Sequence, residues 1–164
     1  MGQNKITQGG IPVLLRLYRS KDLDGVLDLF YRAVHGCCTR DYTQAQLDAW
    51  APQNPDRSRW QKTLTQHYSL VVEGEGGLAA FGDLDGSYLD RLYVHPDCRG
   101  QGLAALLVDA LEARALQGGV KVLRTDASIT ALPFFLARGY RVVREQQVKR
   151  GEQTLTNYAL EREL

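Results

Sequence analysis

The chain has 164 residues, of which 44% are hydrophobic and 24% charged, a balance typical of one folded domain with its own core. Its 20 basic and 19 acidic side chains leave a formal net charge of +1, which argues against nucleic acid or an anionic membrane as the main partner. Three cysteines, and no apolar run near the roughly 18 residues needed to cross a bilayer, predict a protein of the reducing cytoplasm.

The order of predicted elements indicates a mixed α/β fold. Residues 1–10 are polar and glycine-rich, so we expect a flexible N-terminus followed by a single domain over 11–164. Apolar periodicity and capping residues then predict a strand at 13–18, a helix from 20–22 to 34, helices at 45–50 and 56–66, strands at 68–73, 78–84 and 88–94, a helix at 103–117, a strand at 120–125, a short helix at 130–138, and strands at 140–148 and 155–160. The strands between 68 and 94 are joined by tight glycine turns, which favours an antiparallel meander.

A glycine loop opens the helix at 103–117 and carries the clearest chemical signal. The first amides of a helix have no internal partners and carry the positive end of its dipole, so they attract anions. Gly100 and Gly102 remove the Cβ atoms that would keep phosphate oxygens from the backbone, and Ala104 is nearly as small. Arg99 adds a guanidinium that can fork onto a phosphate. The loop therefore predicts a pyrophosphate site.

The same loop could be a Walker A loop, a dinucleotide-binding loop or a plain helix N-terminus. A Walker A loop fails because Leu103 follows the last glycine in place of lysine. A dinucleotide fingerprint matches Gly100, Gly102 and Ala105, but five residues separate the strand from the first glycine and only about 60 residues remain for further βα units. The third is a plain helix N-terminus whose glycines serve packing alone.

The residues Val94-x-Pro96-x-x-Arg99-Gly100-Gln101-Gly102-Leu103-Ala104 resemble the acetyl-CoA signature of the GNAT (GCN5-related) N-acetyltransferases, R/Q-x-x-G-x-G/A. Further stretches resemble the bacterial YafP-like subgroup of that family: Tyr42-Thr43, Ala49-Trp50-Ala51, residues 126–135 with Arg138-Gly139-Tyr140, and Thr156-Asn157-Tyr158. The resemblance covers residues from about 13 to 160.

This resemblance implies a GNAT acyl-CoA N-acyltransferase fold, with a central, mostly antiparallel twisted sheet and helices on both faces. It also implies acetyl-CoA as the acyl donor, direct transfer to a primary amine of a small molecule or peptide, and no metal. The cofactor-binding residues that it implies are Leu92, Tyr93 and Val94 on the strand, Arg99, Gly100, Gln101, Gly102, Leu103 and Ala104 at the loop, and Ser128, Phe134 and Phe135 at the next helix.

The strand at 88–94 holds the candidate catalytic residues. Leu89, Leu92 and Val94 all look like core positions, and strict alternation reconciles them only with a bulge near Asp90 or Arg91. The amine nucleophile must lose a proton, and a carboxylate or a water relay must accept it.

Asp90 is the first candidate for that base, and Tyr88, Tyr42 and Tyr158 are weaker ones, while a solvated or salt-bridged Asp90 is an equally good interpretation. In the family, the region of residues 42 to 60 covers the acceptor pocket, so Tyr42 and Trp50 are expected to bind the acceptor, although Trp50 could equally pack two short helices on the core. Tyr158 is also expected to bind the acceptor. Position 135, where many family members have a tyrosine that protonates the leaving thiolate, is phenylalanine.

Two further functions stay open on the sequence alone. A relative of the same fold that binds acyl-CoA without catalysis would act as a sensor, and an NAD(P)-binding oxidoreductase would use the same loop. His35, Cys37 and Cys38 crowd one helix end, an arrangement that favours a structural role over a metal site. The charged run at Arg57 and Arg59 is interpreted as a solvated face. Both a monomer and a homodimer are compatible with the sequence.

Overall fold

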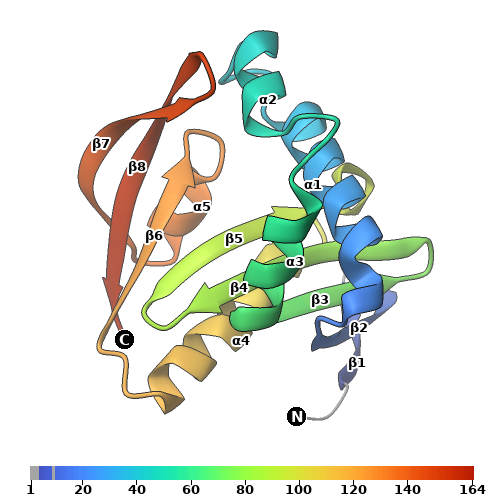
Figure 1. Ribbon diagram of the computed structural model, residues 1–164. Helices are drawn as coiled ribbons and strands as arrows, with labels where there is room; N and C mark the ends of the chain where they lie inside the picture. Colours follow the sequence, from blue (N-terminus) through green and yellow to red (C-terminus); the bar gives the residue numbers. More distant parts are fainter. Residues whose placement is uncertain (1–3, 9) are drawn as a thin grey trace.

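The computed structural model describes residues 4–8 and 10–164, which form one eight-stranded sheet with helices packed on both faces (Figure 1). The strands are β1 (Asn4–Gln8), β2 (Ile11–Leu17), β3 (Tyr68–Gly74), β4 (Gly77–Asp85), β5 (Tyr88–Val94), β6 (Val122–Ser128), β7 (Arg141–Arg150) and β8 (Gln153–Glu163). Their order in the sheet is β1-β2-β3-β4-β5-β6-β8-β7, and among these neighbours only β5 and β6 run parallel. The predicted mixed α/β fold with a mostly antiparallel sheet is confirmed.

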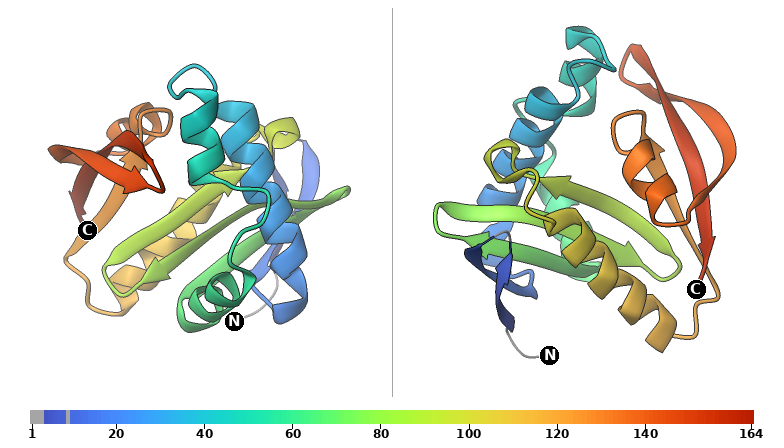
Figure 2. Two further views of the ribbon diagram at one scale, coloured as in Figure 1. Left: turned by 45° about the horizontal axis from the view of Figure 1, so that its top comes forward. Right: turned by 180° about the vertical axis from the view of Figure 1, so that it is seen from behind.

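The helices divide between the two faces of the sheet (Figure 2). They are α1 (Leu23–Cys37), α2 (Gln44–Trp50), α3 (Arg57–Gln66), α4 (Leu103–Gln117) and α5 (Leu132–Ala137). Because side chains alternate along a strand, Val71 and Phe81 pack toward α1, α2 and α3, whereas Leu70 and Leu84 pack toward Leu107 of α4. The sheet therefore separates two hydrophobic cores.

The starts of α2 and α3 follow the capping residues that the sequence predicts. The Thr43 hydroxyl accepts the amide N–H of Gln46 at 3.2 Å, and the Asp56 carboxylate accepts that of Arg59 at 3.1 Å. The turn between β6 and α5 differs from the prediction, because the Ser128 hydroxyl accepts the amide of Ala131 and delays the helix until residue 132.

Strand β1 lies inside the segment for which a flexible terminus is predicted. Its residues 4–8 pair with residues 11–15 of β2, so the described part of this segment is an ordered edge strand. Gly10 turns the chain between the two strands with φ of +83°, a conformation open to glycine. The remaining positions of the prediction, residues 1–3 and 9, lie outside the described residues.

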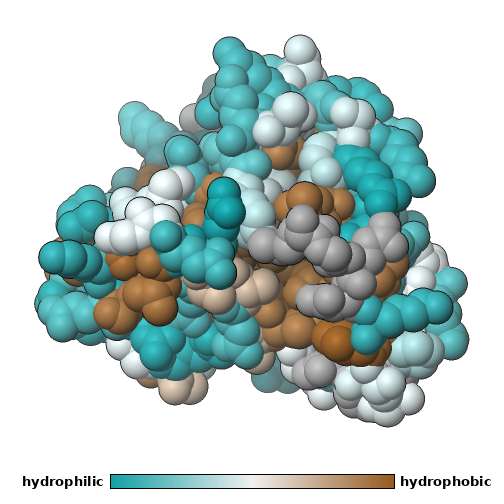
Figure 3. All heavy atoms as spheres, turned by 90° about the horizontal axis from the view of Figure 1, so that it is seen from below, coloured by the Kyte–Doolittle hydropathy of each residue, from teal (hydrophilic) through white to brown (hydrophobic). Residues whose placement is uncertain are grey.

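Hydrophobic side chains reach the surface at several places. Figure 3 shows hydrophobic patches among hydrophilic side chains on the face seen from below. The large apolar side chains that are exposed lie on four different elements and are Leu17, Leu116, Leu136, Val142 and Val143. Among the described residues, no helix is both long and apolar enough to cross a membrane.

Candidate active site

The sheet opens into two arms between β5 and β6. Only Tyr88 and Leu89 of β5 pair with β6, at Arg124 and Thr125, although β5 continues to Val94. The rest of β5 keeps partners in β4 alone, and the two strands diverge (Figure 1). Main-chain groups on this edge of β5 are thus free to bind a ligand between the arms.

A bulge in β5 lies where the arms separate. Two consecutive residues of β4, Asp83 and Leu84, pair with Arg91 and Leu89, which leaves Asp90 without a partner in the ladder. The extra residue changes the alternation, so apolar residues on both sides of the bulge pack against the core under α4. The predicted bulge is confirmed at Asp90.

A cavity of about 700 Å³ passes through the opening between the arms. On the α5 side it is lined by Ser128, Ala131 and Phe135, and on the other side by α3 and the β7–β8 hairpin. One continuous space therefore joins the two faces of the sheet, with a volume in the range of small-molecule sites. The predicted site residues that line it are Tyr42, Trp50, Tyr88, Asp90, Leu92, Tyr93, Ser128 and Phe135.

The Asp90 carboxylate lies in this cavity, and 34% of its side chain is exposed. Burial, and secondly the nearby negative charge of Asp83, raise its pKa above that of an ordinary aspartate. Its Oδ2 atom is 3.7 Å from His67 Nδ1 and 3.7 Å from Arg91 Nε, too far for hydrogen bonds. The Asp90 carboxylate therefore favours its protonated form more than an ordinary aspartate does, with His67 and Arg91 as its charged neighbours.

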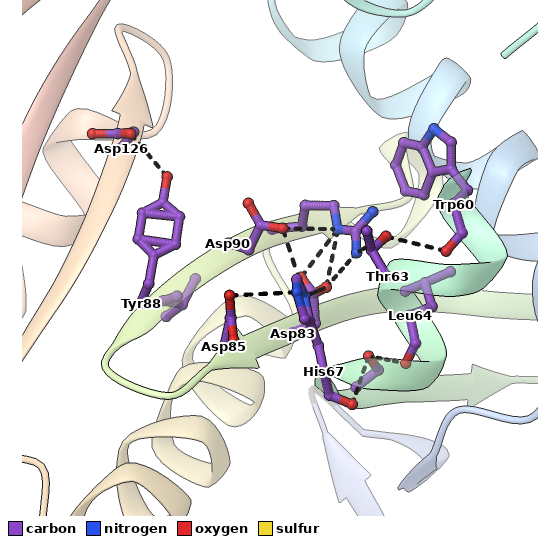
Figure 4. Close-up of polar contacts among 12 residues, drawn as sticks. Trp60, Thr63, Leu64, His67, Asp83, Asp85, Tyr88, Asp90 and Asp126 are labelled. Atoms are coloured by element: carbon purple, nitrogen blue, oxygen red, sulfur yellow. Dashed lines mark hydrogen bonds and ion pairs between the residues drawn. The ribbon is translucent and has the colours of Figure 1, made fainter. Parts of the chain in front are cut away.

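Asp83, Arg91 and His67 form a buried charge network beside Asp90 (Figure 4). Asp83 is fully buried, and it accepts hydrogen bonds from Arg91 Nε at 3.1 Å. His67 Nδ1 lies 2.8 Å from Oδ2 of the same carboxylate, and this hydrogen bond is the largest cause of the raised pKa of His67. Asp83 is thus paired with two cationic groups, as a buried charge requires.

Arg91 also fixes the bulge to helix α3. Its Nη2 donates to the Thr63 hydroxyl at 3.0 Å, and its guanidinium lies 4.5 Å from the centre of the Trp60 ring. These contacts hold the strand on the C-terminal side of Asp90, so the carboxylate has a defined position in the cavity.

The ligand atoms of His67, Asp83 and Asp90 lie within 4.8 Å of one another, a spacing that metal sites also use. Here the positive charge beside Asp83 is supplied by Arg91, whose Nη2 is 2.5 Å from the carboxylate. The donor set consequently suits proton transfer and cation binding at Asp90 better than metal chemistry.

Tyr88 lies where β5 and β6 meet, and its hydroxyl joins the two arms. It donates to Asp126 Oδ2 at 2.8 Å (Figure 4), while Asp126 Oδ1 accepts the Gln146 amide at 3.1 Å. Burial, then the hydrogen bond to Asp126, raise the pKa of Tyr88. A phenol held in this way keeps its proton, so the geometry favours a positioning role for Tyr88 over the predicted catalytic one.

Tyr42 bridges the arms on the opposite side of the cavity. Its hydroxyl accepts the amide N–H of Ile129 at 2.9 Å and donates to the Thr156 carbonyl at 2.6 Å. The predicted acceptor contact is therefore restricted to the ring of Tyr42, because the hydroxyl is fully used in the fold.

Five aromatic rings form a continuous wall along the α1–α3 side of the cavity. Neighbouring ring centroids are 5.5 Å apart for Tyr42 and Trp50, 6.3 Å for Trp50 and Tyr93, 4.9 Å for Tyr93 and Phe30, and 4.8 Å for Phe30 and Trp60. All five residues line the cavity. This aromatic wall suits a flat or apolar ligand.

The residues predicted to bind the diphosphate lie at the N-terminus of α4, outside the cavity. Gly100 and Gly102 both have φ of +76°, and a Cβ on Gly100 would meet no atom within 4 Å. The first hydrogen bond of the helix runs from the Leu106 amide to the Gly102 carbonyl at 3.0 Å, so the preceding amides, including those of Leu103 and Ala104, have no partner within the helix. These features fit a diphosphate, with Arg99 exposed beside them.

The aromatic residues of α5 divide between core and cavity. Phe135 is 3% exposed and contacts Phe134 and Tyr140, with ring centroids 5.2 and 5.0 Å apart. It still lines the cavity, with an edge that carries no hydroxyl. Phe134 is packed against the core under α4.

The structure does not bring Tyr158 to the cavity. Its hydroxyl donates to Glu145 at 3.4 Å on the neighbouring strand, and Thr156 and Asn157 line the cavity instead.

The network of His67, Asp83 and Arg91 was not predicted from the sequence. These residues lie on separate elements, and no local motif marks them.

A splayed sheet, an anion-binding helix N-terminus and a carboxylate-containing cavity between them define an acyl-transferase class of protein. The family model described as acetyltransferase (GNAT) domain matches residues 38–162. The chain belongs to the GNAT family and is an acetyltransferase, and the predicted resemblance is confirmed.

Individual relatives agree with this assignment. The chain is 30% identical over 146 residues to the uncharacterized N-acetyltransferase YafP of Escherichia coli (strain K12), covering 89% of this chain and 93% of that protein. A GCN5-related N-acetyltransferase structure from Rhodopseudomonas palustris matches with a TM-score of 0.90 and 29% identity over 100% of both chains. The structure of YncA, a putative acetyltransferase from Salmonella typhimurium with its cofactor acetyl-CoA, matches with a TM-score of 0.70 and 17% identity over 93% of this chain and 94% of that one.

Proposed function

We propose that this acetyltransferase transfers the acetyl group of acetyl-CoA directly to a primary amine, with both bound at once. The observation that carries the proposal is the cavity, which extends from Ser128, Ala131 and Phe135 on the α5 side to the Asp90 carboxylate. The Salmonella relative that holds acetyl-CoA has the same fold, which supports the choice of donor.

The donor site is assembled from residues that bind and orient. The amides at the start of α4, from Gly100 to Ala104, together with Arg99 and the Gln101 backbone, would hold the diphosphate. The open edge of β5 from Leu92 to Val94 offers main-chain groups to the pantetheine arm. Ser128 and Phe135 line the far side of the cavity, with Phe134 behind them. Acetyl-CoA, when bound there, supplies a thioester carbonyl for attack.

Asp90 has the chemical role on the acceptor side. An amine with a pKa near 10.4 is protonated at neutral pH, and making it neutral costs roughly 4 to 5 kcal/mol. Asp90 takes this proton, the amine nitrogen forms the new bond to carbon, and the bond from carbon to sulfur breaks. Because Phe135 has no exchangeable proton, we propose that a water molecule relays the second proton, which the nitrogen loses as the amide forms, to the departing sulfur.

The proposal also covers the extent of the domain, the cellular compartment and the class of acceptor. Residues 11–164 act as one acetyltransferase domain, because a single sheet connects them. The protein works in the cytoplasm, where its three free cysteines, Cys37, Cys38 and Cys98, stay reduced. Its acceptor is a small molecule or peptide with an accessible amine, and the reaction needs no metal.

The experiment mixes the protein with acetyl-CoA and a panel of primary amines and follows the release of free thiol. We expect thiol release that depends on an amine, together with a thermal shift by CoA and none by NAD(P). Binding of CoA without thiol release would favour an acyl-CoA sensor. A thermal shift with NAD(P) but none with CoA would overturn the proposal.

A further inference from the structure

Some of the charged side chains that line the cavity already have hydrogen-bond or ion-pair partners in the fold, and others do not. Seven such residues line it: Asp56, Arg59, Asp90, Arg91, Asp126, Lys149 and Arg150. Three have structural partners already, because Asp56 caps α3, Asp126 holds Tyr88 and Gln146, and Arg91 is bound to Asp83. The other four are three cations and Asp90, whose Oδ2 atom lies 3.7 Å from both His67 Nδ1 and Arg91 Nε without a hydrogen bond to either.

These three cations, Arg59, Lys149 and Arg150, come from two elements. Arg59 belongs to the first turns of α3, while Lys149 and Arg150 end β7 at the tip of the hairpin. Among the described residues, none of the three has an ion-pair partner.

Arg57 and Arg59 are both exposed, as the predicted solvated charged run requires. Arg57 Nη2 is 2.6 Å from Asp24, and this residue does not line the cavity. Arg59, two residues along the helix, does line it. The two arginines therefore offer a matched pair, one at the site and one away from it.

We infer that the acceptor is an aminocarboxylate with an apolar or aromatic body, a substrate class that rests on the proposed acetyl transfer. Its ammonium group binds at Asp90, its body lies along the aromatic wall, and its carboxylate faces Arg59, Lys149 and Arg150. Three unpaired cations would repel a polyamine, so this charge pattern selects against acceptors with several positive charges.

The test compares pairs of amines that differ only by a carboxylate. The pairs are 4-(aminomethyl)benzoate with benzylamine and phenylalanine with phenethylamine, and spermidine represents the polyamines. We expect kcat/KM to be at least about tenfold higher for the carboxylate member of one pair, chiefly through KM, and this preference to fall in 0.5 M salt. Equal or lower values for both carboxylate members, or spermidine as the best acceptor, would overturn the inference.

Variants connect the preference to the three cations. Arg59→Gln, Lys149→Gln and Arg150→Gln should each raise KM for the carboxylate amine by about 3- to 10-fold and reduce the preference for it over benzylamine, because a rim charge acts on its own counter-charge. Arg57→Gln is the control and should change neither. An equal loss for both members of a pair would show that the cations serve the fold alone.

The inference and the proposed function fail in different ways. If acetyl transfer proceeds with no preference for a carboxylate, the inference is wrong and the function stands. If CoA does not bind and no amine is acetylated, the function itself is wrong. If CoA binds but no panel amine reacts, calorimetry of the same pairs on the CoA-bound protein decides, and equal or absent binding of both members overturns the inference.

Discussion

At the residue scale, Asp90 owes its chemical role to its place in a bulge. The unpaired position turns its carboxylate into the cavity, and burial raises its pKa. We predict that Asp90→Asn lowers kcat/KM for the amine by about 100-fold, the usual range for a general base, with KM for acetyl-CoA unchanged. The loss should be greater at pH 6.5 than at pH 9, because more of the amine is already neutral at high pH.

Asp85→Asn is the matched control for this variant. Asp85 is exposed and ends β4, with its Oδ2 atom 3.6 Å from His67. We expect a change of less than about twofold in kcat/KM. If the rate depends on pH in the same way for Asp90→Asn and for the unchanged protein, Asp90 is not the base. It is then a solvated or salt-bridged residue.

His67 makes stability depend on pH through its raised pKa. Its hydrogen bond to Asp83 favours the protonated form in the folded state. This stabilisation is complete below about pH 6.5, the unfolded pKa, and is lost as the pH rises through the higher folded pKa. We predict that His67→Gln unfolds at lower urea concentration at pH 6, with a difference that shrinks by pH 9. A difference independent of pH would contradict this assignment.

At the element scale, the two arms are held together across the cavity by Tyr42. The change Tyr42→Phe removes one hydrogen bond accepted from Ile129 and one donated to Thr156. We predict a loss of about 1–3 kcal/mol in the free energy of unfolding, because a buried amide and a carbonyl lose their partner. Urea denaturation measures it.

Tyr31→Phe serves as the control for that change. Tyr31 is on α1 and stacks on His35 at 4.1 Å, and its hydroxyl makes no hydrogen bond among the described residues. Its removal should change the free energy of unfolding by less than about 0.5 kcal/mol. Equal effects of the two substitutions would refute the bridging role of Tyr42.

The proposed anion site at the start of α4 can be tested with two side chains of nearly equal shape, of which only one is charged. Gly100 has φ of +76° and open space around its Cβ position, and asparagine and aspartate are the side chains that best tolerate this conformation. Gly100→Asp should weaken CoA binding at least about tenfold more than Gly100→Asn, since only aspartate adds a negative charge beside the diphosphate. Calorimetry measures both, and equal affinities would remove the anion site from this loop.

These elements also show what sequence could predict. The glycine loop is contiguous, so its residues, their spacing and the helix that follows were visible in one stretch. The bulge at Asp90 was visible as a conflict in the alternation of Leu89 and Leu92. The pairing of Asp83 with Arg91 was not, because it depends on the register between β4 and β5. Tyr158 was misplaced for the same reason, since only the register with β7 shows where its hydroxyl goes.

At the scale of the whole molecule, function depends on a sheet that is continuous at one end of β5 and open at the other. The short parallel contact at Tyr88 and Leu89 joins the arms, and the divergence beyond it creates the cavity. Helix α4 lies on one face of the sheet and α1 and α3 lie on the other (Figure 2). In the proposed reaction, the amine and the thioester approach from these opposite faces.

The most direct measurement of this account is isothermal titration of the intact protein with CoA. The structure predicts one site per chain, with a dissociation constant between about 1 µM and 1 mM, the range in which enzymes commonly bind substrates. A folded protein that gives no heat of binding at millimolar CoA would contradict the account. The glycine loop before α4 and the opening beside β5 would then bind some other ligand.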